Sequence, residues 1–465
     1  MRTLLRGGTV VTATDQLRAD VLVEDRRILA LQQDLEATAD QEFDVSGTLV
    51  LPGLVDSHTH LAMPTMGTVT ADDFASGTEA AAAGGTTTII DFALQTDGSL
   101  RRGLAAWEER ADGMAHIDYG FHLAITEATP DAIAEMADVV ADGVTSFKIF
   151  MAFKGSFMAD DEQLLRVLRR TRETGGLVQV HAENGDAIEV NITEALARGE
   201  TSPFAHATTR PTSTEQEATA RAVHLARWAK RPIFVVHVSS ADAAREIQAA
   251  RDEGVPVYGE TCTHYLTLTE DELARPGFEG AKYVCSPPLR SHADHEVLWS
   301  ALRQRALQIC TTDHCPFTFC GQKQLGEDDF SKIPNGLPTI EHRLPLLFQH
   351  GVRAGRLSVS DLVAVASTNP ARMFGLERKG AIAPGFDADI VVLDPEKSLT
   401  INAQAQHMAV DYTPFEGWEC RGAAALVFSR GELIFDGTEV LSQPGRGEYV
   451  PRSFGDFGPG EITRL

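Results

Sequence analysis

The sequence predicts an α/β fold, a TIM-like (β/α)8 barrel with a small β-sandwich domain built from both chain ends. Between residues 54 and 311, eight apolar runs of strand length alternate with helical stretches, which is typical of a parallel barrel. Short β segments precede and follow this region, and 465 residues are long for one domain. A doubly wound open sheet is the alternative, but no Gly-x-Gly-x-x-Gly motif follows the first strand, so a dinucleotide site is unsupported.

The first 53 residues form the N-terminal part of the predicted sandwich. Turn residues such as Gly7-Gly8 separate short runs of alternating apolar residues, which is typical of strands joined by tight turns. The predicted strands are 3–5, 9–12, 20–24, 28–31 and 48–51.

The barrel is predicted over residues 54–379. Its strands are expected at 54–57, 86–92, 119–125, 146–151, 177–180, 233–238, 255–259 and 307–311. Helices are expected at 72–83, 161–173, 213–230 and 241–253, and glycines follow three of them as stop signals. Ser213 and Gln216 have capping-box spacing, and Asn369-Pro370 resembles a helix start with Asn as the cap.

The chain returns to β character at residues 380–442, which form the C-terminal part of the predicted sandwich. A strand is expected at 389–394, and a hairpin at 424–429 and 432–435 turns across Arg430-Gly431. Residues 443–465 are rich in Gly and Pro and hold Tyr449, Phe454 and Phe457. They are either a loose tail or an arm that lies on a neighbouring subunit.

Composition excludes several classes of partner. The net charge is −25, which disfavours nucleic acids and anionic membranes as partners. No apolar run reaches 18 residues, so a membrane span is not expected, and the N-terminus lacks a signal-peptide pattern. The six cysteines have no framework spacing, which favours reduced thiols and a cytoplasmic location.

Residue types that bind metals recur where predicted strands end. His58 and His60 are one residue apart, so they point to the same side of an extended strand. His181, His237 and Asp313 each follow an apolar run. A parallel barrel presents the carboxyl ends of all its strands on one face, where catalysis takes place. A single histidine at a strand end is more often hydrogen-bonded locally, but the five together predict a metal site.

Lys148 is unusual because it lies inside an apolar strand, at 146–151. A bare ammonium is expensive to desolvate there, unless the side chain reaches the barrel rim. Burial lowers the pKa of a lysine and makes the amine nucleophilic. An amine that captures carbon dioxide becomes a carbamate, a ligand with two oxygens that could bridge two divalent ions.

The sequence resembles the dihydropyrimidinase/hydantoinase family of cyclic amidohydrolases, within the amidohydrolase superfamily. The resemblance is carried by Asp56-Ser57-His58-Thr59-His60 and by further stretches along almost the whole chain. The matching stretches are 52–60, 83–92, 146–154, 180–186, 236–240, 285–290, 312–317 and 333–336.

The resemblance implies a binuclear zinc centre, a cytoplasmic enzyme and a homotetramer or homodimer. One zinc ion would be held by His58, His60 and Asp313, and the other by His181 and His237. Lys148, as N6-carboxylysine, would bridge the two ions. Ser286 and Asn335 would bind the amide edge of the substrate through their backbone groups.

The implied reaction is hydrolytic ring opening of a cyclic ureide, a dihydropyrimidine or a 5-substituted hydantoin, to an N-carbamoyl amino acid. Two metal ions lower the pKa of a bridging water and supply hydroxide at neutral pH. Asp313 takes the proton and passes it to the leaving nitrogen. Phe153 stands where the family usually has a substrate-binding tyrosine, and this departure predicts altered substrate choice unless it is neutral drift. Met63, Met66, Phe153 and Phe157 could line an apolar pocket or pack within loops.

Three other functions are weighed against this one. Dihydroorotase would need an arginine two residues after the second histidine, and Ala62 stands there. Allantoinase belongs to the same reaction class and stays open. A non-catalytic scaffold protein would be expected to have lost metal ligands, whereas all six are present here.

Overall fold

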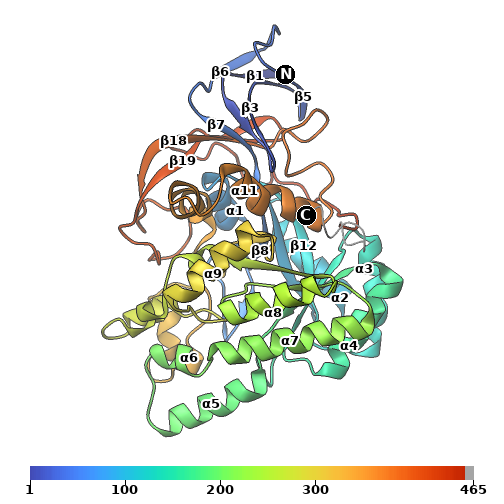
Figure 1. Cartoon of the computed structure of the whole chain (residues 1–465), viewed down its shortest axis with the longest axis vertical. Helices are drawn as coiled ribbons and strands as arrows, with labels where there is room; N and C mark the ends of the chain where they lie inside the picture. Colours follow the sequence, from blue (N-terminus) through green and yellow to red (C-terminus); the bar gives the residue numbers. More distant parts are fainter. Residues whose placement is uncertain (456–465) are drawn as a thin grey trace.

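The barrel forms the centre of the molecule in a computed structural model that describes residues 1–455 (Figure 1). Eight strands pair in parallel in one sheet, in the order β17-β16-β15-β14-β13-β12-β11-β8. At the rim, His60 N donates to His314 O at 2.9 Å, so the first and last strands meet and the barrel is nearly closed. The strands are β8 (Leu54–Thr59), β11 (Thr86–Leu94), β12 (Asp118–Ala124), β13 (Ser146–Phe150), β14 (Leu177–His181), β15 (Ile233–Val235), β16 (Val257–Cys262) and β17 (Ile309–Thr311).

Helices cover the outside of the barrel, and Figure 1 shows α2, α4, α7 and α8 along its flank. Apolar side chains from these helices and from the strands form one large buried cluster. The helices of ten residues or more are α1 (Phe74–Ala83), α2 (Leu100–Ala111), α3 (Pro130–Ala141), α4 (Asp161–Thr174), α5 (Gly185–Ala197), α7 (Thr212–Ala229), α8 (Ala241–Asp252) and α9 (His292–Arg303).

The chain ends meet in two further sheets, at the top of Figure 1. Strand β18 (Ile390–Thr400) pairs with β7 (Leu49–Pro52), which joins the C-terminal and N-terminal β segments. One sheet has the order β5-β4-β1-β6 and the other β20-β19-β18-β7-β2-β3. Their remaining strands are β1 (Arg2–Arg6), β2 (Thr9–Val11), β3 (Gln16–Arg18), β4 (Asp20–Glu24), β5 (Arg27–Gln32), β6 (Gln41–Asp44), β19 (Glu419–Ser429) and β20 (Glu432–Phe435). The predicted fold class is confirmed.

Two strands of these sheets were not expected from the sequence. Strand β3 is exposed at all three residues, and β6 is exposed at three of its four. Neither shows the apolar alternation that identifies a half-buried strand. Both are edge strands, and they form through backbone pairing with buried neighbours.

The predicted capping roles of Ser213 and Asn369 are wrong, although both helices start within one residue of the predicted positions. Helix α7 begins one residue earlier, after Pro211, and no side chain caps it. Ser213 is therefore already inside the first turn. Asn369 continues a helical stretch that starts upstream, and its side chain donates to Gln308 O at 2.8 Å. The stop signal after α4 is confirmed, because Gly175 is left-handed with φ 89°.

The described part of the tail, residues 443–455, lies along the barrel of its own chain. Tyr119 N donates to Glu448 O at 3.0 Å, and Val450 N donates to Tyr119 O at 2.7 Å. The guanidinium of Arg452 is buried and donates to Ser146 Oγ at 2.9 Å. Phe457 lies outside the described residues, and the domain boundaries and the subunit arm stay predictions.

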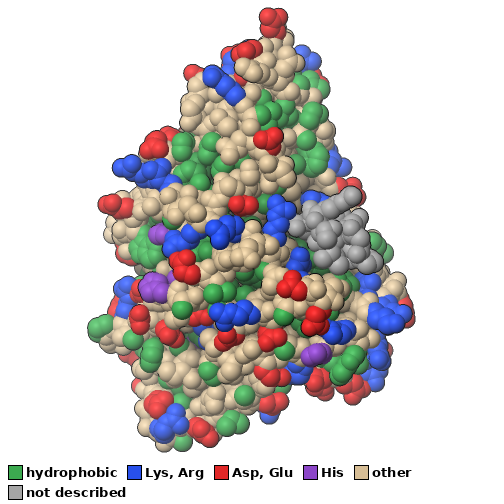
Figure 2. Space-filling model, viewed as in Figure 1, with side chains coloured by type: hydrophobic (Ala, Val, Ile, Leu, Met, Phe, Trp, Pro, Cys, Tyr) green, Lys and Arg blue, Asp and Glu red, His purple; other side chains and the backbone are tan. Residues whose placement is uncertain are grey.

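Charged side chains are dispersed over the surface. On the face that Figure 2 shows, acidic and basic side chains are interspersed, so the net charge of −25 is not gathered into one acidic patch there. Among residues 1–455, no helix is long and apolar enough to cross a membrane.

Candidate metal centre and active site

A cavity of about 450 Å³ opens at the carboxyl ends of the barrel strands. Side chains from loops after several strands line it, as expected for the catalytic face of such a barrel. All the predicted site residues line it, namely His58, His60, Lys148, Phe153, His181, His237, Ser286, Asp313 and Asn335.

The first ligand group comes from both sides of the barrel closure. His58 is the fifth residue of β8, and His60 follows the strand. Their Nε2 atoms lie 3.1 Å and 3.2 Å from Asp313 Oδ1. Asp313 lies two residues after β17 with φ 46°, a left-handed conformation that aspartate tolerates better than most residues. The turn aims its carboxylate at the two histidines.

The second ligand group lies beside the first. His181 ends β14, and its Nδ1 is 2.9 Å from Nε2 of His237. His237 lies two residues past β15 in a strained backbone conformation with φ 40°. Such strain is found mainly where the surrounding structure fixes a functional side chain. The rings of His58 and His237 are 5.4 Å apart, so the two groups share one site.

Lys148 lines the same cavity, and it is 1% exposed. Its Nζ is 4.7 Å from the centre of the Phe92 ring and 5.3 Å from that of Phe150. Burial lowers the pKa of Lys148 to about 8. A substantial fraction of the amine is therefore neutral near physiological pH, which is the form that reacts with carbon dioxide.

Burial and charge set the protonation of the ligands. Burial lowers the pKa of His60 to about 4 and also lowers the pKa of His181 and of His237, so these rings are neutral and have lone pairs to offer. Burial would raise the pKa of Asp313, but the nearby His58 holds it well below the usual value. The aspartate is therefore ionised.

The donor set fits divalent cations. The Nδ1 of His58 bonds to Glu260, so Nε2 is the ring nitrogen that faces Asp313, 3.1 Å from its carboxylate oxygen. Burial would lower the pKa of His58, but Asp313 and Glu260 raise it above the usual value, so the ring and the aspartate face each other as an ion pair. A cation at this place would displace the ring proton and be bound by one imidazole and one carboxylate. Imidazole nitrogens and carboxylate oxygens are ligands that zinc accepts.

The chain matches a known family. Residues 49–434 match the family model described as "Amidohydrolase family". The chain belongs to the amidohydrolase family. A D-hydantoinase of Streptomyces coelicolor is 51% identical over 97% of this chain and 98% of its own length. A dihydropyrimidinase of Arabidopsis thaliana is 42% identical over 97% of this chain and 85% of its own length.

Solved structures of similar proteins also match this amidohydrolase over almost its whole length. The crystal structure of a dihydropyrimidinase from Brevibacillus agri superimposes with a TM-score of 0.97 at 50% identity. The match covers 98% of this chain and 99% of that one. The similarity therefore extends over the barrel and both sandwich sheets.

Two carboxylates that hold the ligand histidines were not assigned a role from the sequence. Glu260 on β16 bonds to Nδ1 of His58, and Glu183 bonds to Nε2 of His181 at 2.8 Å. Both are fully buried. Each fixes the tautomer that leaves the other ring nitrogen as a lone pair facing the site. Glu260 directly follows the predicted strand 255–259, and the observed strand β16 extends to Cys262 and contains it.

Replacing Glu260 with glutamine should weaken metal binding by this amidohydrolase. An amide cannot accept from His58 as strongly as a carboxylate does, so the ring loses basicity and orientation. Loss of such a partner typically costs 10–100-fold in metal affinity. Titration with a competing chelator measures the change. Unchanged affinity would show that Glu260 has no part in holding the ligand.

The outer wall of the cavity is apolar. Met63, Met66, Phe153 and Phe157 all line it, and Met63, Phe153 and Phe157 also pack in or against the buried apolar cluster. The ring of Phe153 is 4.8 Å from that of His181 and its backbone is left-handed, with φ 67°. Its side chain has no hydroxyl to donate into the cavity.

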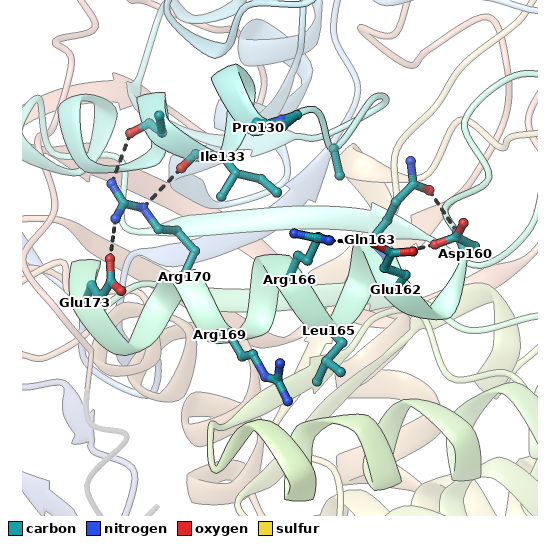
Figure 3. A pocket seen from close by; sticks show the side chains of 12 residues that line it. Pro130, Ile133, Asp160, Glu162, Gln163, Leu165, Arg166, Arg169, Arg170 and Glu173 are labelled. Atoms are coloured by element: carbon teal, nitrogen blue, oxygen red, sulfur yellow. Dashed lines mark hydrogen bonds and ion pairs between the residues drawn. The ribbon is translucent and has the colours of Figure 1, made fainter.

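A larger hollow of about 940 Å³ lies elsewhere, between α3 and α4 on the outside of the barrel (Figure 3). Its charged side chains are largely paired within the hollow. Arg166 pairs with Glu162, and Arg170 pairs with Glu173 and also donates to Ile133 O. None of the predicted site residues lines it. The smaller cavity at the strand ends is therefore the candidate active site.

Proposed function

We propose that this amidohydrolase opens cyclic ureides, either dihydropyrimidines or 5-substituted hydantoins, to N-carbamoyl amino acids. One observation carries the proposal. All six expected ligand residues meet in the cavity that Ser286 and Asn335 also line. The similar proteins named D-hydantoinase and dihydropyrimidinase support the same substrate class. A scaffold protein without catalysis would have no need for this arrangement.

The residues that line the cavity would have different roles. When bound, two divalent ions, which we propose to be zinc, would polarise the ring carbonyl and lower the pKa of water. His58, His60 and Asp313 would hold one ion, and His181 and His237 the other. Carboxylated Lys148 would bridge them, because a bare ammonium would repel the cations.

The chain's own groups would move the proton and place the substrate. Asp313 is ionised and lies at the ligand cluster, so it can accept a proton from the attacking water and return it to the leaving nitrogen. Ser286 and Asn335 would pair with the amide edge of the ring through backbone groups. Met63, Met66 and Phe157 would contact an apolar 5-substituent.

A panel of substrates tests the function. Chelator-free enzyme should hold two divalent ions per chain and hydrolyse dihydrouracil or a 5-substituted hydantoin. Allantoin is the control, because the absence of a hydroxyl at Phe153 leaves allantoinase as the rival activity. If the enzyme hydrolyses allantoin alone, allantoin takes the place of the proposed substrates. If it binds no metal and hydrolyses none of these compounds, the proposed hydrolase activity is refuted.

Replacing Phe153 with tyrosine should raise kcat on dihydrouracil or hydantoin. A hydroxyl at this position would donate to the oxyanion that develops on the ring carbonyl. Loss of one well-placed oxyanion donor typically lowers kcat by 10²–10³. We expect a smaller gain, of about tenfold, because the surrounding loop is not arranged around a tyrosine hydroxyl. Steady-state kinetics on both substrates measure it, and unchanged or lower kcat would contradict the expectation.

Assembly and location complete the proposal. We propose a cytoplasmic homotetramer, with a homodimer as the alternative. The cysteines favour the cytoplasmic location, since all six are free thiols in the structure. Light scattering on the eluting peak of a gel-filtration run gives the mass and decides between four chains and two.

A further inference from the structure

Lys323 is a buried lysine outside the candidate ligand cluster, and every hydrogen-bond acceptor found for its ammonium among residues 1–455 is a backbone carbonyl. Its Nζ donates to Val284 O at 2.9 Å, to Pro334 O at 2.6 Å and to Gly336 O at 2.8 Å. The side chain is 0% exposed. An ammonium has three N–H donors and no acceptor, so these three carbonyls saturate it.

The three carbonyls belong to the two segments that carry the expected substrate contacts. Val284 lies two residues before Ser286, and Pro334 and Gly336 flank Asn335. Gly336 N also donates to Val284 O at 2.9 Å, so the segments are tied to each other at the same point. One cation therefore joins the two walls of the cavity that would hold the amide edge of the ring.

The position of Pro334 O decides where the Asn335 amide points. The carbonyl of one residue and the N–H of the next belong to the same planar trans peptide, so they point in opposite directions. When Lys323 holds Pro334 O, it aims the Asn335 N–H away from itself. The acceptor that this N–H meets is Met66 Sδ at 3.4 Å, a weak thioether acceptor on the cavity wall. The amide is therefore available to a stronger acceptor from a substrate.

We propose that Lys323 is a positioning residue that sets the backbone donors and acceptors of the substrate site by clamping segments 284–286 and 334–336. The inference rests on the proposed function, because it concerns how that same site recognises a cyclic ureide. Lys323 does not touch the substrate or the metal ligands. Its charge strengthens the three hydrogen bonds, since charge-assisted bonds are about twice as strong as neutral ones.

Burying a lysine at this position costs folding free energy, which indicates that its hydrogen bonds have a role. Burial without a carboxylate lowers the pKa of Lys323 to about 7, so the ammonium with three donors is the main form below this pH and the neutral amine above it keeps only two. The groups facing it are the thiols of Cys285 and Cys315 and the ring of Phe317 at 5.7 Å. Burial raises the pKa of both thiols, so they are neutral. A methionine would fill the same space without this cost, but it could not hold the carbonyls.

The test compares Lys323→Met with Lys332→Met, a matched control. Lys332 lies on the same connection, is exposed, and pairs with Asp329 at 3.2 Å. In Lys323→Met we expect KM for the hydrolysed ureide to rise about tenfold, the scale of a lost charge-assisted hydrogen bond. Metal content should be unchanged and kcat should change less than KM. Lys323→Gln keeps two N–H donors and should give an intermediate KM.

Hydrogen exchange provides a readout that does not depend on turnover. Amides of segments 284–286 and 334–337 should exchange faster in Lys323→Met than in Lys332→Met, while barrel strands keep their protection. Uniformly faster exchange, or an unchanged KM with unaltered exchange in both segments, would overturn the clamp. If the wild-type enzyme hydrolyses no ureide, the proposed function fails, and the exchange result still decides the role of Lys323.

Discussion

Replacing Lys148 with alanine is expected to lower kcat/KM by about 10³-fold or more and to remove bound metal. The residue is buried in the cavity that both candidate ligand groups line, so its loss would leave both ions without the proposed bridging anion. Loss of one electrostatic contact at a reacting centre alone costs 10²–10³, and here the metal centre itself is affected. Steady-state kinetics and metal analysis measure the two effects.

Chemical rescue separates the proposed carbamate from a purely structural role of Lys148. Acetate or propionate can occupy the space left in Lys148→Ala and supply two oxygens where the carbamate would lie. We expect partial recovery of activity with added zinc and carboxylate, and no effect of the carboxylate on Lys332→Ala. Full activity of Lys148→Ala without any carboxylate would rule out the bridging role.

The pH dependence of carbamate formation follows from the pKa of Lys148, which burial lowers to about 8. The protonated amine, dominant below this pH, does not react with carbon dioxide, whereas the neutral amine, dominant above it, does. The assay adds zinc to metal-free enzyme at constant dissolved carbon dioxide and follows the return of activity. The rate of this return should rise from about pH 7 and level off at about pH 9. A rate that falls over this range would contradict the assignment.

Replacing Asp313 with asparagine is expected to reduce kcat by about 10³-fold, within the 10²–10⁴ that positioned proton transfer contributes. The amide keeps the shape of the side chain but cannot take the proton. Asp313 is ionised because the nearby His58 holds its pKa well below the usual value, so the wild-type base is ready over the whole working range of pH.

The control for Asp313→Asn is Asp186→Asn, which changes an exposed carboxylate that pairs with Lys154 near the cavity mouth. Metal analysis must accompany the kinetics, because Asp313 is also an expected ligand. A large loss of kcat with metal retained would support proton transfer. A kcat within about threefold of wild type would place the base elsewhere.

Much of the fold could be predicted because the barrel strands are short, apolar and separated by glycine-terminated helices. Strands at the chain ends were missed where they are exposed, as in β3 and β6. Their pairing depends on neighbours far along the chain rather than on their own residues. Helix starts were predicted to the residue at Asp161 and Ala241, whereas the cap predicted at Ser213 is wrong because Pro211 begins the helix without a capping side chain.

The sequence by itself determined which residue types stand at the ends of the barrel strands, because spacing and apolar runs are local properties. Only the tertiary structure decided how those residues face one another. The bond from Glu260 to His58 and the bond from Lys323 to Val284 O join residues 202 and 39 positions apart in the chain. Such contacts form only when the barrel closes, so local sequence patterns do not predict them.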